Sequence, residues 1–149
     1  MAGAIRRALK PFLDIRIGDA RIYGRRGKVR FPKNFNGHFA KGDTVIKVHV
    51  ETKPATPTGR RDIATALREL RKKSIALKNE DGIAGIYGDS QNPTVVNHFK
   101  RVYRRNVDVF KPPFWAGKLA KAKYRLNVTR KKYPKEHAKK PPKRVVVKF

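Results

Sequence analysis

The sequence predicts an α+β fold, in which a small mixed sheet with two main helices carries long basic N- and C-terminal extensions. Three observations support this prediction: one segment with strand alternation, two segments with helical apolar spacing, and two flanks rich in lysine and arginine. We expect residues 1–40 to form a basic N-terminal extension with a short helix and a hairpin. Residues 41–110 are then the α+β core, and residues 111–149 a basic C-terminal extension.

The first segment combines a helical pattern with short extended pieces. Residues 1–13 place apolar side chains at helical spacing among basic ones, with no acid before Asp14. This pattern predicts a short amphipathic helix and is also typical of a mitochondrial targeting sequence. The run Gly24–Lys28 predicts a basic hairpin tip in which Arg25 and Arg26 contact phosphate, and a plain solvated turn is the alternative.

The middle segment contains the clearest strand and the clearest helix. Residues 43–51 alternate between apolar and polar side chains, which predicts a strand with one buried face. Residues 52–59 are rich in proline and threonine and predict a loop. A helix follows and stops at Asp81-Gly82. Its core positions, at helical spacing, are Ile63, Leu67, Leu70, Ser74 and Leu77.

A second helix is predicted after a short buried strand at residues 83–87. Asn92 suits the capping position and Pro93 the first helical position. The apolar stripe of this helix contains Val96, Phe99, Val102 and Tyr103. Cations occupy the opposite side, and we expect them to contact RNA, with a merely solvated basic face as the alternative.

The last segment, residues 111–149, interleaves cations with aromatic residues. Rings among cations suit the stacking of unpaired bases. Phe114 and Trp115, directly after two prolines, instead favour a compact hydrophobic plug that anchors the segment to its own domain or to a neighbour. We favour the plug for Trp115. Residues 145–147 predict a strand that adds to the edge of a partner's sheet.

Charge is the strongest signal in the composition. The 149-residue chain carries 38 lysines and arginines against 11 aspartates and glutamates, a formal net charge of +27. Residues 98–149 hold 18 of the basic residues and two of the acidic ones, whereas residues 41–97 are nearly balanced. Because a compact chain of this charge repels itself, we expect a polyanionic partner, and nucleic-acid phosphates are the commonest one.

Patterns for catalysis and metal binding are missing from the sequence. There is no cysteine, and the four histidines do not fall at ligand spacing. There is no phosphate-binding loop motif, no nucleophile elbow, and no run of about 18 apolar residues that would span a membrane. We therefore expect a protein that is not an enzyme, with no cofactor, no bound metal, no small-molecule substrate and no membrane span.

The chain resembles ribosomal proteins as a class, in its basic flanks, its small α+β middle and its runs Lys-Lys-Tyr-Pro-Lys and Lys-Lys-Pro-Pro-Lys. The run Ala-Ile-Arg-Arg-Ala-Leu-Lys near the start is more similar to mitochondrial members. The resemblance implies a structural constituent of a ribosome that binds rRNA and neighbouring ribosomal proteins and supports assembly. The mitochondrial matrix is the expected location, and a plastid or cytosolic ribosome is the alternative.

The residues expected to contact rRNA phosphates are all basic and lie in the flanks and the second helix. They are Arg6, Arg7, Lys10, Arg25, Arg26, Lys28, Arg30, Lys100, Arg101, Arg104, Arg105, Lys118, Lys121, Lys123, Arg125, Arg130, Lys131 and Lys132. Two other functions stay open. One is a free DNA- or RNA-binding or chaperone-like basic factor, and the other is a basic accessory subunit of a mitochondrial membrane complex.

Overall fold

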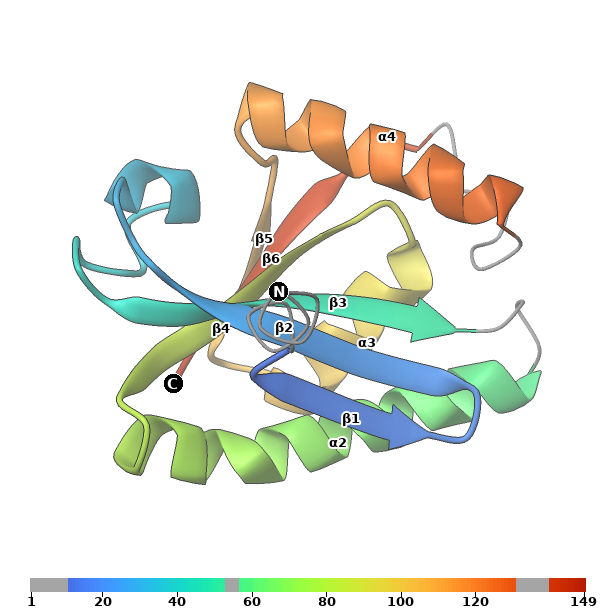
Figure 1. Cartoon of the computed structure of the whole chain (residues 1–149), viewed down its shortest axis with the longest axis horizontal. Coiled ribbons are helices and arrows are strands. Elements are labelled where there is room, and N and C mark those ends of the chain that lie inside the picture. The colour runs from blue at the N-terminus through green and yellow to red at the C-terminus, as the bar shows by residue number, and fades with distance from the viewer. Residues whose placement is uncertain (1–10, 53–56, 131–139) are drawn as a thin grey trace, which may run out of the picture.

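The computed structural model describes residues 11–52, 57–130 and 140–149, which form one six-stranded sheet with helices on both faces (Figure 1). In chain order the elements are β1 (Leu13–Ile17), β2 (Ala20–Lys28), the short 3-10 helix η1 (Pro32–Phe35), β3 (Thr44–Thr52), α2 (Pro57–Asn79), β4 (Ile83–Ser90), α3 (Pro93–Tyr103), β5 (Val107–Phe110), α4 (Phe114–Thr129) and β6 (Lys143–Lys148). The predicted α+β class with a mixed sheet is confirmed, and α4 is a third α-helix where we expected two.

The strands lie in the order β1-β2-β3-β4-β6-β5. β3 and β4 are parallel and are joined by α2, whereas the other neighbouring strands are antiparallel. β1 and β2 come from residues 1–40, and α4 and β6 come from residues 111–149, so both flanks contribute to the same sheet as the middle segment. The predicted N-terminal helix falls mainly on residues 1–10, outside the described residues, and Leu13 at its end begins β1.

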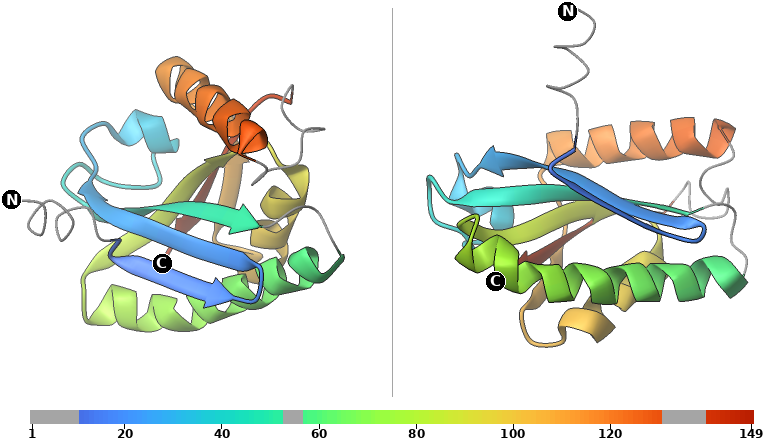
Figure 2. Two further views of the ribbon diagram at one scale, coloured as in Figure 1. Left: turned by 45° about the vertical axis from the view of Figure 1, so that its right-hand side comes forward. Right: turned by 60° about the horizontal axis from the view of Figure 1, so that its bottom comes forward.

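One face of the sheet is apolar and is covered by α2 and α3 (Figure 2). Ile22, Ile46 and Val48 on the strands pack against Ile63, Leu67 and Leu70 of α2, and all six side chains are buried. The helical spacing predicted for α2 is thus confirmed, because its apolar positions face the sheet. The predicted cap of α3 is confirmed as well, since the Asn92 side chain accepts a hydrogen bond from the Thr94 backbone N–H at 3.0 Å.

The other face of the sheet has a smaller apolar area. A cluster of Val29, Phe35, Phe39, Val45 and Val146 packs the segment that contains η1 against the sheet. The rest of this face is polar and lies beneath α4 (Figure 2). We call it the polar face, and it carries Tyr23 and Arg25 of β2, Lys47, His49 and Glu51 of β3, and Asp89 of β4.

The prediction of a hairpin tip at Gly24–Lys28 is wrong, because these residues pair with β3 inside β2. A Cβ atom on Gly24 would collide with the Lys47 carbonyl oxygen, so the glycine allows close strand approach rather than a turn. The turn between β1 and β2 instead contains Gly18, with φ +53°. Asp62 of α2 accepts a hydrogen bond from the Asp19 backbone N–H at 3.0 Å and ties this turn to the helix.

Two predictions for the last segment need correction. Phe114 and Trp115 are 77% and 58% exposed, so they do not form a hydrophobic plug against their own domain within the described residues, and their anchoring to a neighbouring protein stays a prediction. The strand at residues 145–147 is real, but it lies inside the chain's own sheet, between β4 and β5, rather than on a partner. Its four consecutive buried residues, 144–147, are typical of a strand covered on both faces.

Candidate nucleic-acid interface

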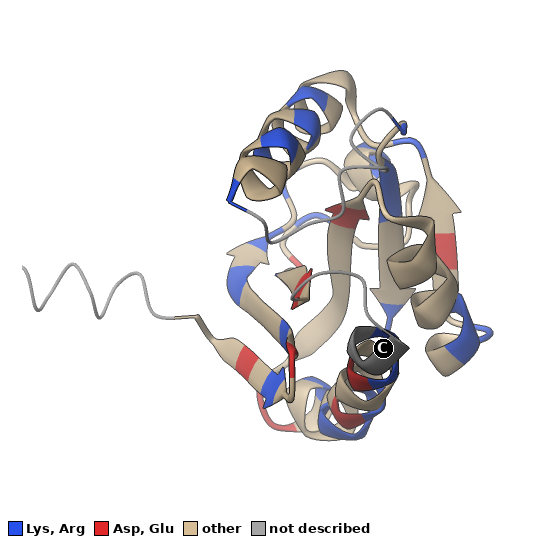
Figure 3. Cartoon of the chain, turned by 90° about the vertical axis from the view of Figure 1, so that its right-hand side faces the viewer, with Lys and Arg blue, Asp and Glu red and all other residues tan. Residues whose placement is uncertain are grey.

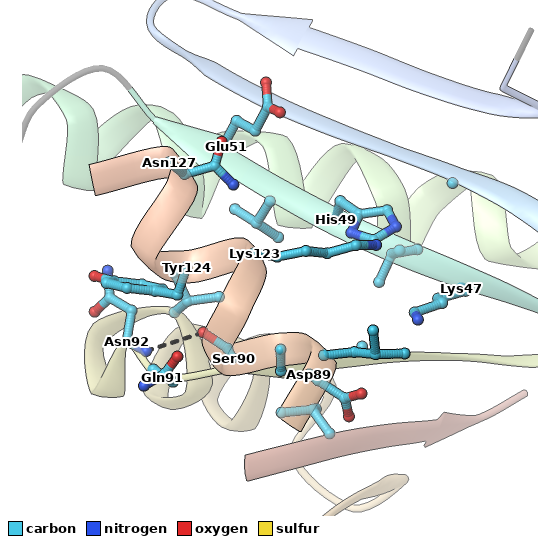
Figure 4. A pocket seen from close by; sticks show the side chains of 18 of the residues that line it. Lys47, His49, Glu51, Asp89, Ser90, Gln91, Asn92, Lys123, Tyr124 and Asn127 are labelled. Carbon is cyan, nitrogen blue, oxygen red and sulfur yellow. Dashed lines mark hydrogen bonds between the residues drawn. The ribbon is translucent and has the colours of Figure 1, made fainter. Parts of the chain in front are cut away.

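The polar face contains a cavity at the point where two parallel strands diverge. The pairing of β3 with β4 runs from Thr44 to Lys47 on β3, although β3 continues to Thr52 and β4 to Ser90. α4 crosses over the opening (Figure 4). The resulting cavity has a volume of about 650 Å³ and is lined by residues of β2, β3, β4, β6, α3 and α4. Segments far apart in the sequence therefore build a single site.

Cations surround this cavity. Arg25 and Lys47 lie opposite each other on β2 and β3 and face the same side of the sheet. Lys123 extends from α4 toward His49, as Figure 4 shows, and Arg130 lines the cavity just beyond the end of α4. Positive side chains thus come from both the floor and the roof of the cavity.

Burial and the nearby positive charges lower the pKa values of two residues on the cavity floor. Burial, together with the positive charges of Lys123 and Lys47, lowers the pKa of His49 to about 4. Burial is also the main cause that lowers the pKa of Lys47, and repulsion from Lys123 adds to it. A bound anion would relieve this repulsion, because it would favour the charged form of each group.

The two carboxylates on the cavity wall already have partners. Glu51 accepts a hydrogen bond from the Tyr23 hydroxyl at 2.9 Å. Asp89 accepts hydrogen bonds from the buried guanidinium of Arg144 at 2.8 and 3.0 Å, and Arg144 also donates to the Asn34 carbonyl oxygen. Since Arg144 balances Asp89, the cavity presents a net positive charge to a ligand.

The tyrosine beside Glu51 adds an aromatic surface to the floor. The rings of Tyr23 and His49 stack with their centroids 5.2 Å apart. Burial and the hydrogen bond to Glu51 raise the pKa of Tyr23 to about 12, so its hydroxyl remains a donor at neutral pH. Cations, hydrogen-bonding groups and flat rings therefore share one site.

The structure divides the predicted phosphate-contacting residues among separate surfaces (Figure 3). Arg25, Lys123 and Arg130 line the cavity. Lys118, Lys121 and Arg125 are exposed elsewhere on α4, and Arg26, Lys28 and Arg30 are exposed at the end of β2 and after it. Lys100, Arg101, Arg104 and Arg105 are exposed at the end of α3, on the opposite side of the sheet from α4. Arg6, Arg7, Lys10, Lys131 and Lys132 lie outside the described residues.

Sequence reasoning missed the floor of the cavity and the helix above it. The alternation in residues 43–51 places Lys47, His49 and Glu51 on one face, and β3 confirms this. However, nothing in that alternation indicates that the next strand is parallel or diverges from β3. Such information depends on contacts between distant segments.

Two negative findings apply to the residues that the structure describes. None of their helices has both the length and the apolar character needed to cross a bilayer. They also contain no cluster of three or more histidine and acidic side chains that could hold a metal ion.

Comparison with known proteins gives no family for this chain. No protein-family model matches it, and no curated protein matches it.

Proposed function

We propose that this protein binds the phosphate backbone of nucleic acid, with the cavity and the exposed side of α4 as its main contact surface. The observation that carries the proposal is the gathering of Arg25, Lys47, Lys123 and Arg130 around one opening, where burial, together with repulsion from Lys123, disfavours the charged forms of Lys47 and His49. Each phosphate paired with such a cation releases a counterion, which drives association. The net charge of +27 makes the whole chain suitable for a polyanion.

The protein could bind RNA either as a constituent of a ribosome or as a free factor. Long basic extensions favoured a structural ribosomal protein over a free factor, but β1, β2, α4 and β6 come from those flanks. A folded basic domain is as well suited to a free RNA-binding factor. We propose RNA binding as the function and a structural role in a ribosome, mitochondrial or other, as its specific form.

Sedimentation of cell extracts separates these two settings. A ribosomal constituent stays with the particle through a gradient at moderate salt, whereas a free factor is lost from it. If the protein instead migrates with a membrane complex and not with RNA, the nucleic-acid proposal fails.

A pair of charge-reversal variants tests the surface itself. We expect K123E/R130E to weaken RNA binding strongly. The fall of log K, the association constant, with log salt concentration should become less steep by about 2, because two phosphate contacts are lost. The matched control is R101E/R105E, which makes the same change in net charge on the α3 side of the sheet. If the control variant loses binding and the cavity variant does not, the α3 surface is the interface and the cavity is not.

A second candidate function, a transferase that uses a phosphorylated carrier, is favoured by the position of the cavity. β3 and β4 are parallel neighbours, and ligands of α/β sheets usually bind at the carboxyl ends of such strands. Thr52 lines the cavity and ends β3, and the cations around the cavity suit a phosphate group. Where β3 and β4 diverge, an extended ligand with amide groups has room to lie along a strand.

These features together suit a ligand with a phosphate end and an amide-bearing arm, such as an acyl derivative of phosphopantetheine. Thermal unfolding with coenzyme A, with adenosine 3′,5′-bisphosphate and with phosphopantetheine tests this candidate. We expect coenzyme A to raise the melting temperature more than either half alone, because it fills both parts of the site. If coenzyme A and adenosine 3′,5′-bisphosphate raise the melting temperature equally, the site binds phosphate in general, and the proposal of a phosphopantetheine carrier is wrong.

A further inference from the structure

The exposed side of α4 carries an unusual amount of apolar surface. Trp115, Leu119 and Leu126 are 58%, 54% and 48% exposed, and all three line the mouth of the cavity. At about 3.6 residues per turn they fall on one side of the helix. Large apolar side chains that remain this exposed at the rim of a site mark it as a binding surface.

Cations border this apolar stripe along its length. At helical spacing, Lys118 and Arg125 lie on one side of the stripe, and Lys123 and Arg130 lie on the side that faces the cavity. The sequence of α4 contains no acidic residue. A ligand for this surface must therefore combine flat or apolar groups with closely spaced negative charges.

Unpaired nucleic acid has this chemistry. Its phosphates recur along the strand, and the faces of its bases are free to stack on aromatic side chains. In a duplex the bases stack on one another, so their faces cannot reach Trp115. A second copy of the same chain would bring another +27 charge to the surface and would be repelled.

We propose that α4 and the cavity bind a single-stranded segment of nucleic acid, in which Trp115 stacks on a base while Lys123 and Arg130, about 12 and 22 Å farther along the helix axis, contact phosphates farther along the strand. This inference rests on the proposed phosphate binding and adds the class of nucleic acid to it. The stacked rings of Tyr23 and His49 on the cavity floor offer a second flat surface inside the opening.

The chain contains one tryptophan, so tryptophan fluorescence reports on Trp115 alone. The experiment titrates the full chain with a single-stranded oligouridylate, with an RNA duplex of the same length, and with inorganic polyphosphate. We expect the single strand to quench the emission of Trp115, whereas the duplex and polyphosphate bind without comparable quenching.

Variants measured with a labelled oligonucleotide complete the test. W115A should weaken single-strand binding by about 5- to 150-fold, the range for loss of one base stack, and leave duplex binding unchanged. W115F should retain most of the affinity. F114A is the matched control, because Phe114 is more exposed than Trp115 but does not line the cavity, and it should behave as the unmodified chain.

Each other outcome overturns the inference in a recognisable way. If W115A affects single strands and duplexes equally, or affects neither, base stacking at Trp115 is rejected while phosphate binding stands. If no nucleic acid binds at all, the proposed function fails together with the inference. If anionic lipid vesicles shift the Trp115 emission and the single strand does not, the stripe is a membrane contact.

Discussion

The two faces of the sheet are built from the same strands, but one face packs into the apolar core and the other borders the cavity. On the side of α2 and α3, apolar strand residues such as Ile46 and Val48 meet apolar helix residues in one continuous core. On the side of α4, the intervening residues Lys47 and His49 meet Lys123 across a cavity. The first face stabilises the fold, and the second keeps charge and open space at some cost to stability. This difference predicts that substitutions on the two faces change stability by different amounts and, on the polar face, in a way that depends on charge and pH.

The largest expected effect is on the apolar face. Leu67 is fully buried between α2 and the sheet, so L67D places an unpaired charge in the core and should cost about 4 kcal/mol or more of unfolding free energy. Urea unfolding followed by circular dichroism measures this loss. I75D is the matched control on the same helix, because Ile75 is 69% exposed, and it should change stability by less than about 0.5 kcal/mol.

The next effect concerns the buried ion pair on the polar face. The side chains of Arg144 and Asp89 are 3% and 7% exposed, so R144A leaves a buried carboxylate without its partner and should cost about 3–5 kcal/mol. R21A is the matched control, because Arg21 and Asp14 form a pair whose side chains are 32% and 30% exposed. That pair should contribute less than about 1 kcal/mol. Equal losses in the two variants would contradict the role given to burial.

The smallest expected effect is the pH dependence that His49 confers. Its pKa is about 4 in the folded chain against an ordinary 6.5, so between these values the unfolded chain binds a proton that the folded chain does not. Stability should therefore fall as the pH is lowered from about 6.5 to 4, and H49Q should reduce that fall. Urea unfolding of both proteins at pH 7 and pH 5 measures the difference. A steeper fall in H49Q would reverse the assignment.

The elements with strong local patterns were predictable from the sequence. β3 alternates strictly, α2 repeats its apolar positions at helical spacing, and α3 begins with an Asn-Pro cap. In each case the residues that define the element are neighbours in the chain. Such signals do not depend on which other segments pack against the element.

α4 was not predictable because its large apolar residues are not the ones that face the sheet. The side chains of Ala116 and Tyr124 are buried, whereas Trp115, Leu119 and Leu126 are exposed, so no clean apolar stripe faces the sheet. The exposed apolar side chains that made the helix hard to predict are also the observation on which the proposed binding surface rests. The cavity was hidden for a different reason, since it depends on the parallel pairing of β3 and β4, which no local pattern records.

The position of β6 has a consequence for how the chain folds as it is made. β4 and β5 are both complete before β6 is synthesised, yet β6 is the strand that joins them in the sheet. At a synthesis rate of roughly 5–20 residues per second, the edge of β4 that pairs with β6 therefore stays unpaired for several seconds. During this interval it presents an open strand edge, which favours pairing with other chains. The site between β3, β4 and α4 and the finished sheet should thus form together, as one late step.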